Sequence, residues 1–184
     1  MAAREGRASL AEIVLQKWDS LDDKTTAMNQ ALLWATRGGH PDVLETLLDH
    51  GASVNTQTER GKTPLIVAAG RGFRAAAALL LERGAVIDHR TELGNTALIA
   101  AVHKGHKEVV ALLLANGATV EITSRDGQSA LTIAERAGRL EVLELLRARL
   151  MSQRLDDKNT SGSAVTTPPE APVANPPEAG RWNA

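Results

Sequence analysis

Hydrophobic positions recur along the middle of this chain with a period of about 33 residues. Each period contains an apolar run with helical spacing, a glycine, a second apolar run and another glycine. Four columns stay in register through successive periods, which predicts an array of stacked supersecondary units. The columns are Leu32, Leu65, Leu98 and Leu131; Gly39, Gly72, Gly105 and Gly138; Gly51, Gly84 and Gly117; and Gly61, Gly94 and Gly127.

The stretch 94–117 shows the elements of one unit most clearly. Thr96 is suited to cap a helix that starts after it, and Gly105 allows the left-handed conformation that ends this helix. In the run that follows, Val109, Leu112 and Leu113 lie three and four residues apart, which predicts a second helix with one apolar face. Two such helices cannot bury their apolar stripes alone, so each unit needs its neighbours.

The runs that open these units carry a family signature. They read Thr63-Pro64-Leu65-Ile66-Val67-Ala68-Ala69 and Thr96-Ala97-Leu98-Ile99-Ala100-Ala101. Together with the glycine, the Leu-rich second helix and a Gly-Ala exit, they resemble the ankyrin repeat, whose opening is T-P-L-H-x-A. The resemblance implies an all-α solenoid of helix-turn-helix repeats joined by hairpin loops. The histidine of the signature is absent, because Leu33, Ile66, Ile99 and Thr132 occupy its positions.

The period divides the chain into a terminal half-unit, four repeats and a tail. Leu10, Val14 and Leu15 stand one full period before Val43, Leu47 and Leu48, so the N-terminal segment is interpreted as a degenerate capping half-repeat. The first full copy has Gln30-Ala31-Leu32-Leu33 at the signature, which weakens its helix cap. The expected ranges are 6–24 for the half-repeat; 25–57, 58–90 and 91–123 for repeats 1 to 3; 124–155 for the C-terminal capping repeat 4; and 156–184 for the tail.

The tail differs in composition from the repeats. It holds five of the seven prolines, with Ser, Thr, Asn and Gly and only scattered apolar residues. Such a segment cannot bury enough apolar surface to offset the entropy of ordering, so it is predicted to be disordered.

The amino-acid composition excludes some kinds of site and argues against others. The chain has no cysteine, which excludes disulfides and a cysteine nucleophile, and only 2% aromatic residues, which argues against an aromatic-lined ligand pocket. Neither a signal peptide nor a membrane-spanning run is recognisable. We therefore expect a cytoplasmic protein, with the nucleus left open, that is monomeric and has no membrane partner and no small-molecule substrate.

No set of residues points to catalysis, and the protein is not expected to be an enzyme or to hold a cofactor. His103 and His106 have a spacing that suits a metal on a helix face. They flank Gly105 at a helix turn, however, and His40 and His106 stand where the family has a structural histidine. No metal site is therefore predicted.

The candidate binding surface follows from the resemblance. Partners of ankyrin proteins usually contact the hairpin tips and the ends of the first helices. Counted over these positions, fixed charges give +5, against −1 for the whole chain, so about −6 lies elsewhere. The predicted partner-binding residues are Arg37, Arg60, Lys62, Arg71, Arg90, His103, Lys104, Arg125 and Arg136.

A positive concave strip raises the local concentration of acidic partners, so we expect an adaptor or regulatory scaffold that binds an acidic segment of another protein. A plainer interpretation is that cations at helix C-termini, such as Arg37 and Arg136, only oppose helix dipoles. A nucleic-acid-associated regulator that uses the same face stays open as the alternative. The pI near 6.5 and the few aromatics make nucleic acid the less favoured partner.

Overall fold

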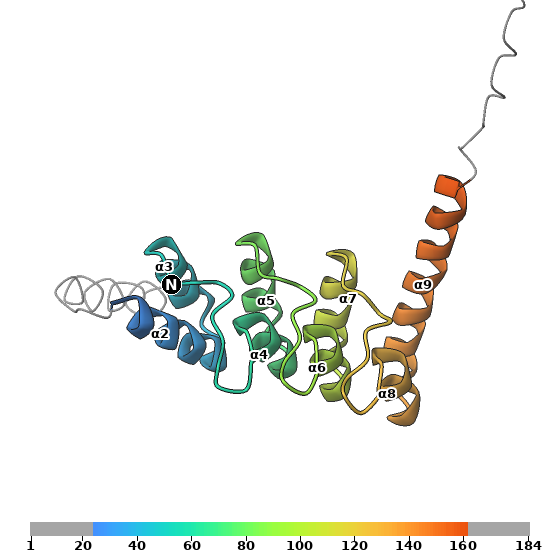
Figure 1. Ribbon diagram of the computed structural model, residues 1–184, viewed down its shortest axis with the longest axis horizontal. Coiled ribbons are helices and arrows are strands. Elements are labelled where there is room, and N and C mark those ends of the chain that lie inside the picture. Colours follow the sequence, from blue (N-terminus) through green and yellow to red (C-terminus); the bar gives the residue numbers. More distant parts are fainter. Residues whose placement is uncertain (1–23, 162–184) are drawn as a thin grey trace, which may run out of the picture.

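The computed structural model describes residues 24–161, and side chains as far as Gln153. This part of the chain is helical, and its helices alternate between two rows (Figure 1). The first row holds α2 (Lys24–Gly38), α4 (Pro64–Arg71), α6 (Ala97–Lys104) and α8 (Ala130–Arg136). The second row holds α3 (Pro41–Asp49), α5 (Arg74–Glu82), α7 (Lys107–Ala115) and α9 (Leu140–Ser161).

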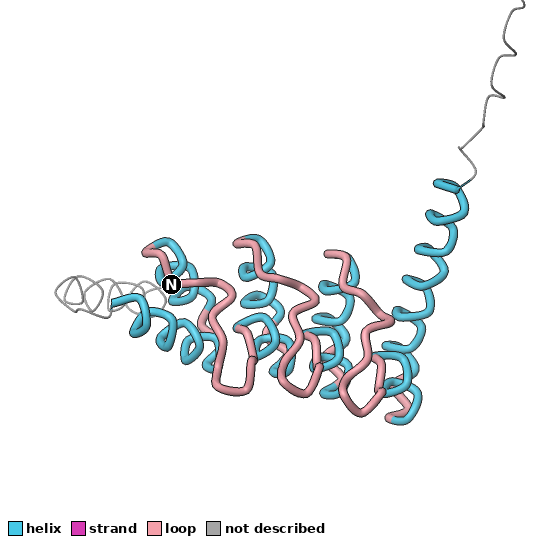
Figure 2. Tube along the Cα trace, in the orientation of Figure 1, coloured by secondary structure: helices cyan, strands magenta, loops and turns pink. Residues whose placement is uncertain are grey.

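Each helix contacts its partner in the same repeat and the equivalent helix of the next repeat, as in α4 with α5 and α4 with α6. Long loops join successive pairs and repeat the same path along the stack (Figure 2). Within residues 24–161 the only β-type pairing is an isolated antiparallel bridge between Thr123 and Ser129. The expected all-α solenoid is confirmed.

The helices of the first row are called the inner helices below, and those of the second row the outer helices. The predicted caps begin and end the inner helices α4 and α6. Thr63 accepts a hydrogen bond at Oγ1 from the Ile66 amide at 3.4 Å, and Thr96 does the same for Ile99 at 3.3 Å. Gly72 follows α4 with a φ of 77°, in the left-handed region that favours glycine. Helices α4 and α6 are therefore only about two turns long, because each is closed at both ends by its own sequence.

The core is a set of aligned columns between the two rows of helices. Leucines at equivalent positions of the outer row are at most 3% exposed, and small alanines stand opposite them in the inner row. In α7 the buried face differs slightly from the prediction, because Val110 and Leu114 are buried where Leu112 is only half-buried. The leucine column is Leu47, Leu80, Leu113 and Leu146, and the alanine column is Ala35, Ala68, Ala101 and Ala134.

Side chains that follow the inner-helix glycines seal successive repeats. A Cβ added at Gly39 would lie 2.9 Å from the Phe73 ring, and one at Gly72 would lie 2.6 Å from Nδ1 of His106. Each ring therefore rests on the bare backbone of the preceding repeat. Ala76 and Ala77 in the helix that follows Phe73 are buried as well.

The first and last helices reach the limits of the described residues. Helix α2 is described from Lys24, the first residue that the structure describes. Helix α9 continues past residue 155 to Ser161, since neither proline nor glycine interrupts it before Gly162. The expected repeat ranges, with a tail from residue 156, stay predictions. The half-repeat at 6–24 and the tail beyond Ser161 lie outside the described residues, apart from Lys24.

Candidate functional site

A groove of about 970 Å³ runs along the inner helices, between the helix surfaces and the hairpin loops. Its floor is apolar and small. Gly70 on α4 faces α6 so closely that an added Cβ would lie 3.7 Å from Cβ of Ala100. The remaining floor residues that line the groove are Ile66, Val67, Ile99 and Ile133.

Cations stand at the helix-end side of the groove because the inner helices stop at glycines. Arg71 occupies the last turn of α4 directly before Gly72, and Lys104 occupies the last turn of α6 before Gly105. Arg37 lies in the last turn of α2. All three line the groove together with His103. Their charges oppose the negative helix termini, as the plainer interpretation requires.

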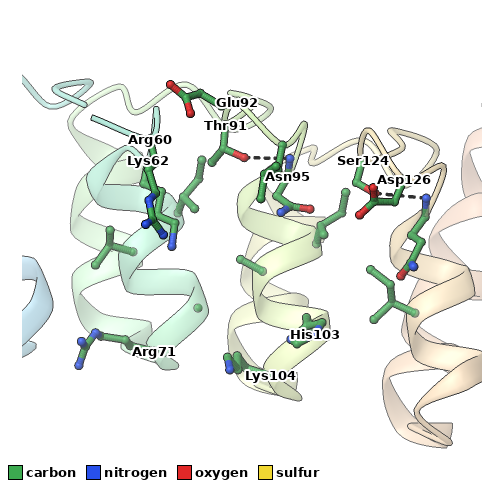
Figure 3. A pocket seen from close by; sticks show the side chains of 18 of the residues that line it. Arg60, Lys62, Arg71, Thr91, Glu92, Asn95, His103, Lys104, Ser124 and Asp126 are labelled. Carbon is green, nitrogen blue, oxygen red and sulfur yellow. Dashed lines mark hydrogen bonds between the residues drawn. The ribbon is translucent and has the colours of Figure 1, made fainter. Parts of the chain in front are cut away.

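A second group of cations lies on the hairpin side. The turn that carries Arg60 is closed by the Thr58 amide, which donates to the Lys62 carbonyl at 3.0 Å. The Lys62 amide in turn donates to Oγ1 of Thr58 at 3.1 Å. The same closure recurs in the next hairpin, where the Asn95 amide donates to Oγ1 of Thr91 at 3.1 Å. These turns therefore hold their side chains on fixed backbones (Figure 3).

The two groups are separated along the helix axis. Arg60 and Lys62 lie at the hairpin end of the inner helices, and Arg71 and Lys104 lie at the other end (Figure 3). An eight-residue helix such as α6 rises about 12 Å at 1.5 Å per residue. The groove thus has an apolar floor between two charged margins, which are separated by about the 12 Å length of such a helix.

The groove is positive overall. Five Arg and Lys side chains and two carboxylates line it, which gives +3 with His103 neutral. Among the described residues, none of these five cations takes part in an ion pair, because the ion pairs there involve Arg83, Lys107 or Arg147 elsewhere on the surface. The carboxylates are Glu92 and Asp126, which both belong to later hairpins. The positive charge is therefore concentrated toward α2, α4 and the hairpin at residues 58–62.

Six of the nine predicted residues line this groove, and three do not. Arg90 donates from Nη2 to the Thr123 carbonyl at 2.7 Å and so links one hairpin to the next. Arg125 and Arg136 are exposed but stand outside the groove lining. The six that come together are Arg37, Arg60, Lys62, Arg71, His103 and Lys104.

Two exposed apolar side chains were not predicted, of which one lines the groove. Leu93 lies at a hairpin tip within the lining and is 63% exposed, and Trp34 on α2 is 67% exposed. The repeat register contains the information needed to find Trp34, because Val67, Ala100 and Ile133 of the same column all line the groove. A count of charged residues identifies neither Leu93 nor Trp34, because both are uncharged.

His103 and His106, whose spacing would suit a metal, lie in different parts of the structure. His103 lines the groove, whereas the His106 ring rests on Gly72 between two repeats. Over the described part of the chain, no three His, Cys, Asp or Glu side chains gather in a way that could hold a metal ion. None of the helices described there combines the length and apolarity needed to cross a membrane.

Comparison with protein families gives one finding. A family model described as ankyrin repeats, with 3 copies, matches residues 1–91 and 84–159. The two matched ranges together span the groove and nearly all of the chain outside the tail. A comparison with curated proteins gives no match.

Proposed function

This chain belongs to the ankyrin repeat family, whose members are generally protein–protein interaction modules, and we propose that its groove binds an acidic segment of a partner protein. Members of this family are typically scaffolds without enzymatic activity. The observation that carries the proposal is the cluster of five cations around one apolar floor, none of which pairs with an acid in the part of the chain that the structure describes. Carboxylates of a bound segment supply the missing counter-charges.

Helix-dipole compensation explains only part of this cluster. Arg37, Arg71 and Lys104 lie at helix C-termini and gain about 0.3–1 kcal/mol each from that position. Arg60 and Lys62 lie in a hairpin turn that precedes a helix, where the dipole disfavours a positive charge. Their presence beside the same groove supports selection for an anionic ligand.

The shape of the groove supports a segment that crosses several repeats. Carboxylates on both edges of such a segment reach the hairpin cations and the helix-end cations, while its apolar side chains cover the floor. Because the positive charge is concentrated toward α2 and α4, the most acidic part of the segment is placed there. Glu92 and Asp126 repel carboxylates at the opposite end and so set the direction of the segment.

Links between repeats keep the groove in shape before a partner arrives. Asn55 accepts at Oδ1 from the Val86 amide at 2.9 Å. One repeat later, Asp88 accepts from the Thr119 amide at 3.1 Å and from the Thr119 hydroxyl at 2.6 Å. A surface that is rigid in its binding shape loses less conformational entropy on association.

Selection from a library of random 12-residue peptides displayed on phage tests the proposal. The full chain is immobilised, and bound peptides are sequenced after washes at low and high salt. We expect Asp and Glu to be enriched severalfold over the unselected library, and the enrichment to weaken in the high-salt wash because exposed charge pairs are screened. Selected peptides with no excess of acidic residues would contradict the proposal.

A labelled single-stranded DNA of 20 nucleotides serves as the competing ligand in the same buffers. Nucleic acid that neutralises several cations shows a steep linear fall of log affinity with log salt concentration. If the DNA binds more tightly than the best acidic peptide and shows that slope, the groove is a nucleic-acid site and the acidic-peptide proposal is wrong.

A further inference from the structure

We propose that Trp34 and Arg37 form an anchor site at the α2 end of the groove, which takes a large apolar side chain of the partner next to a carboxylate. This inference rests on the proposed function, because it specifies what the acidic segment must carry besides its charge.

The position of Trp34 places it in line with the groove floor. Val67, Ala100 and Ile133 occupy the equivalent position in the three repeats that follow, and all three line the groove. Helix α2, which carries Trp34, contacts α4 as α4 contacts α6. The indole therefore extends the apolar floor by one repeat, beyond the end set by α4.

The exposure of Trp34 is unusual for its residue type. Tryptophan is highly buried on average, yet 67% of Trp34 is exposed, in a chain with only 2% aromatic residues. A tryptophan is also the residue most typical of binding hot spots, because its large ring loses little entropy when a partner covers it. Covering the indole therefore stabilises a complex more than covering any other residue on this floor.

Arg37 already holds the indole in place. Its guanidinium carbon lies 5.1 Å from the centroid of the Trp34 ring, one helical turn along α2. A guanidinium that stacks on a ring keeps its N–H donors in the plane and free for a carboxylate. Since Arg37 also lines the groove, the pair offers one apolar surface and one anion-binding edge side by side.

This arrangement defines the chemistry of the ligand. A leucine, methionine or aromatic side chain fits the open part of the indole, and an Asp or Glu one or a few residues away reaches Arg37. An acidic segment without a large apolar residue gains the groove charges but not this anchor. The anchor thus gives the site a sequence preference that charge alone does not give.

Repeating the peptide selection on Trp34→Ala tests the anchor separately from the charge. Leu140→Ala is the control, since Leu140 is 71% exposed but lies on α9, in the other row of helices. On the unchanged chain and on the control, we expect acidic enrichment together with one fixed large apolar position. On Trp34→Ala, the acidic enrichment should persist and the apolar position should be lost.

Affinity and fluorescence of one selected peptide complete the test. Fluorescence anisotropy should show at least about tenfold weaker binding to Trp34→Ala, and no change for Leu140→Ala. In the full chain with Trp18→Phe and Trp182→Phe, only Trp34 emits. Its emission should shift to shorter wavelength and become protected from acrylamide when the peptide binds.

The outcomes separate the two proposals. Identical apolar preferences on Trp34→Ala and the unchanged chain, or no change in Trp34 emission, overturn the anchor and leave the acidic groove standing. A Trp34-dependent apolar preference without acidic enrichment overturns the acidic groove instead. Neither preference on the unchanged chain overturns both.

Discussion

Replacing Gly72 with alanine should destabilise the stack for two separable reasons. The φ of 77° puts an alanine in the left-handed region, which costs about 1–2 kcal/mol. The new Cβ would also lie 2.6 Å from Nδ1 and 2.8 Å from Cε1 of His106, so the ring must leave its place between two repeats. Overpacking of this kind costs a further 1–3 kcal/mol or so, which gives a total of about 2–5 kcal/mol.

Gly84 supplies the matched control. Its φ is 83°, and nothing lies within 4 Å of an added Cβ, so Gly84→Ala should cost only the backbone part, about 1–2 kcal/mol. Free energies of unfolding come from urea titrations followed by circular dichroism, with equal slopes required for the comparison.

A double variant tests the assignment of the excess to the ring. His106 begins α7 without a side-chain cap, so His106→Ala removes no capping hydrogen bond. In that background the cost of Gly72→Ala should fall to that of Gly84→Ala. If Gly72→Ala and Gly84→Ala cost the same with His106 present, or if the excess survives His106→Ala, the ring does not seal the repeats as described.

Three further predictions concern the links and ends of the stack. Asp88→Ala removes both bonds from Thr119 and should cost about 1–3 kcal/mol by urea unfolding, with partial recovery in Asp88→Asn; an unchanged midpoint would contradict the link. Lys107 donates a hydrogen bond to Glu141 and lowers the pKa of that carboxyl. The pair therefore stabilises the folded chain above the unfolded-state pKa of about 4.3, and this stabilisation is lost as pH falls through the lower folded-state pKa. The melting temperature of Glu141→Gln should therefore lie below that of the unchanged chain at pH 6 and converge with it in strong acid, and a constant difference would refute the pairing. Ending the chain after Ser161 should leave the melting temperature unchanged, because the removed composition offers no apolar face to the repeats, whereas a drop of several degrees would show that it does.

Most of the fold could be predicted because the helices α4 and α6 each carry their own start and stop. Thr63 and Thr96 cap helices as their sequence position requires, and the glycines end those helices in the left-handed conformation. The start of the first full repeat could not be predicted in this way, because its signature Gln30-Ala31-Leu32-Leu33 lacks the Thr-Pro cap.

The site could be predicted only in part, because charge type does not reveal what a side chain already contacts. Arg60 and Arg90 both lie near hairpins and look equivalent in sequence. Arg60 lines the groove, whereas Arg90 donates to the Thr123 carbonyl of the next hairpin. That contact joins equivalent stretches of two successive repeats, so it depends on how closely the repeats stack. Trp34, in contrast, follows from the register once its column is known to face the groove.

The binding of a selected acidic peptide to two charge-matched variants tests the groove most directly. Both variants replace three exposed cations by glutamine, which keeps helix propensity and changes the net charge equally. The groove variant combines Arg60→Gln, Lys62→Gln and Arg71→Gln, and the control combines Arg74→Gln, Arg125→Gln and Arg136→Gln outside the groove lining.

At about 0.5–1 kcal/mol for each exposed charge contact, the groove variant should bind the peptide about 10–100-fold more weakly than the unchanged chain. The control should lose no more than about twofold, which the smaller long-range attraction accounts for. Equal losses in the two variants would show that only net charge matters, and an unchanged affinity of the groove variant would contradict an acidic partner in the groove.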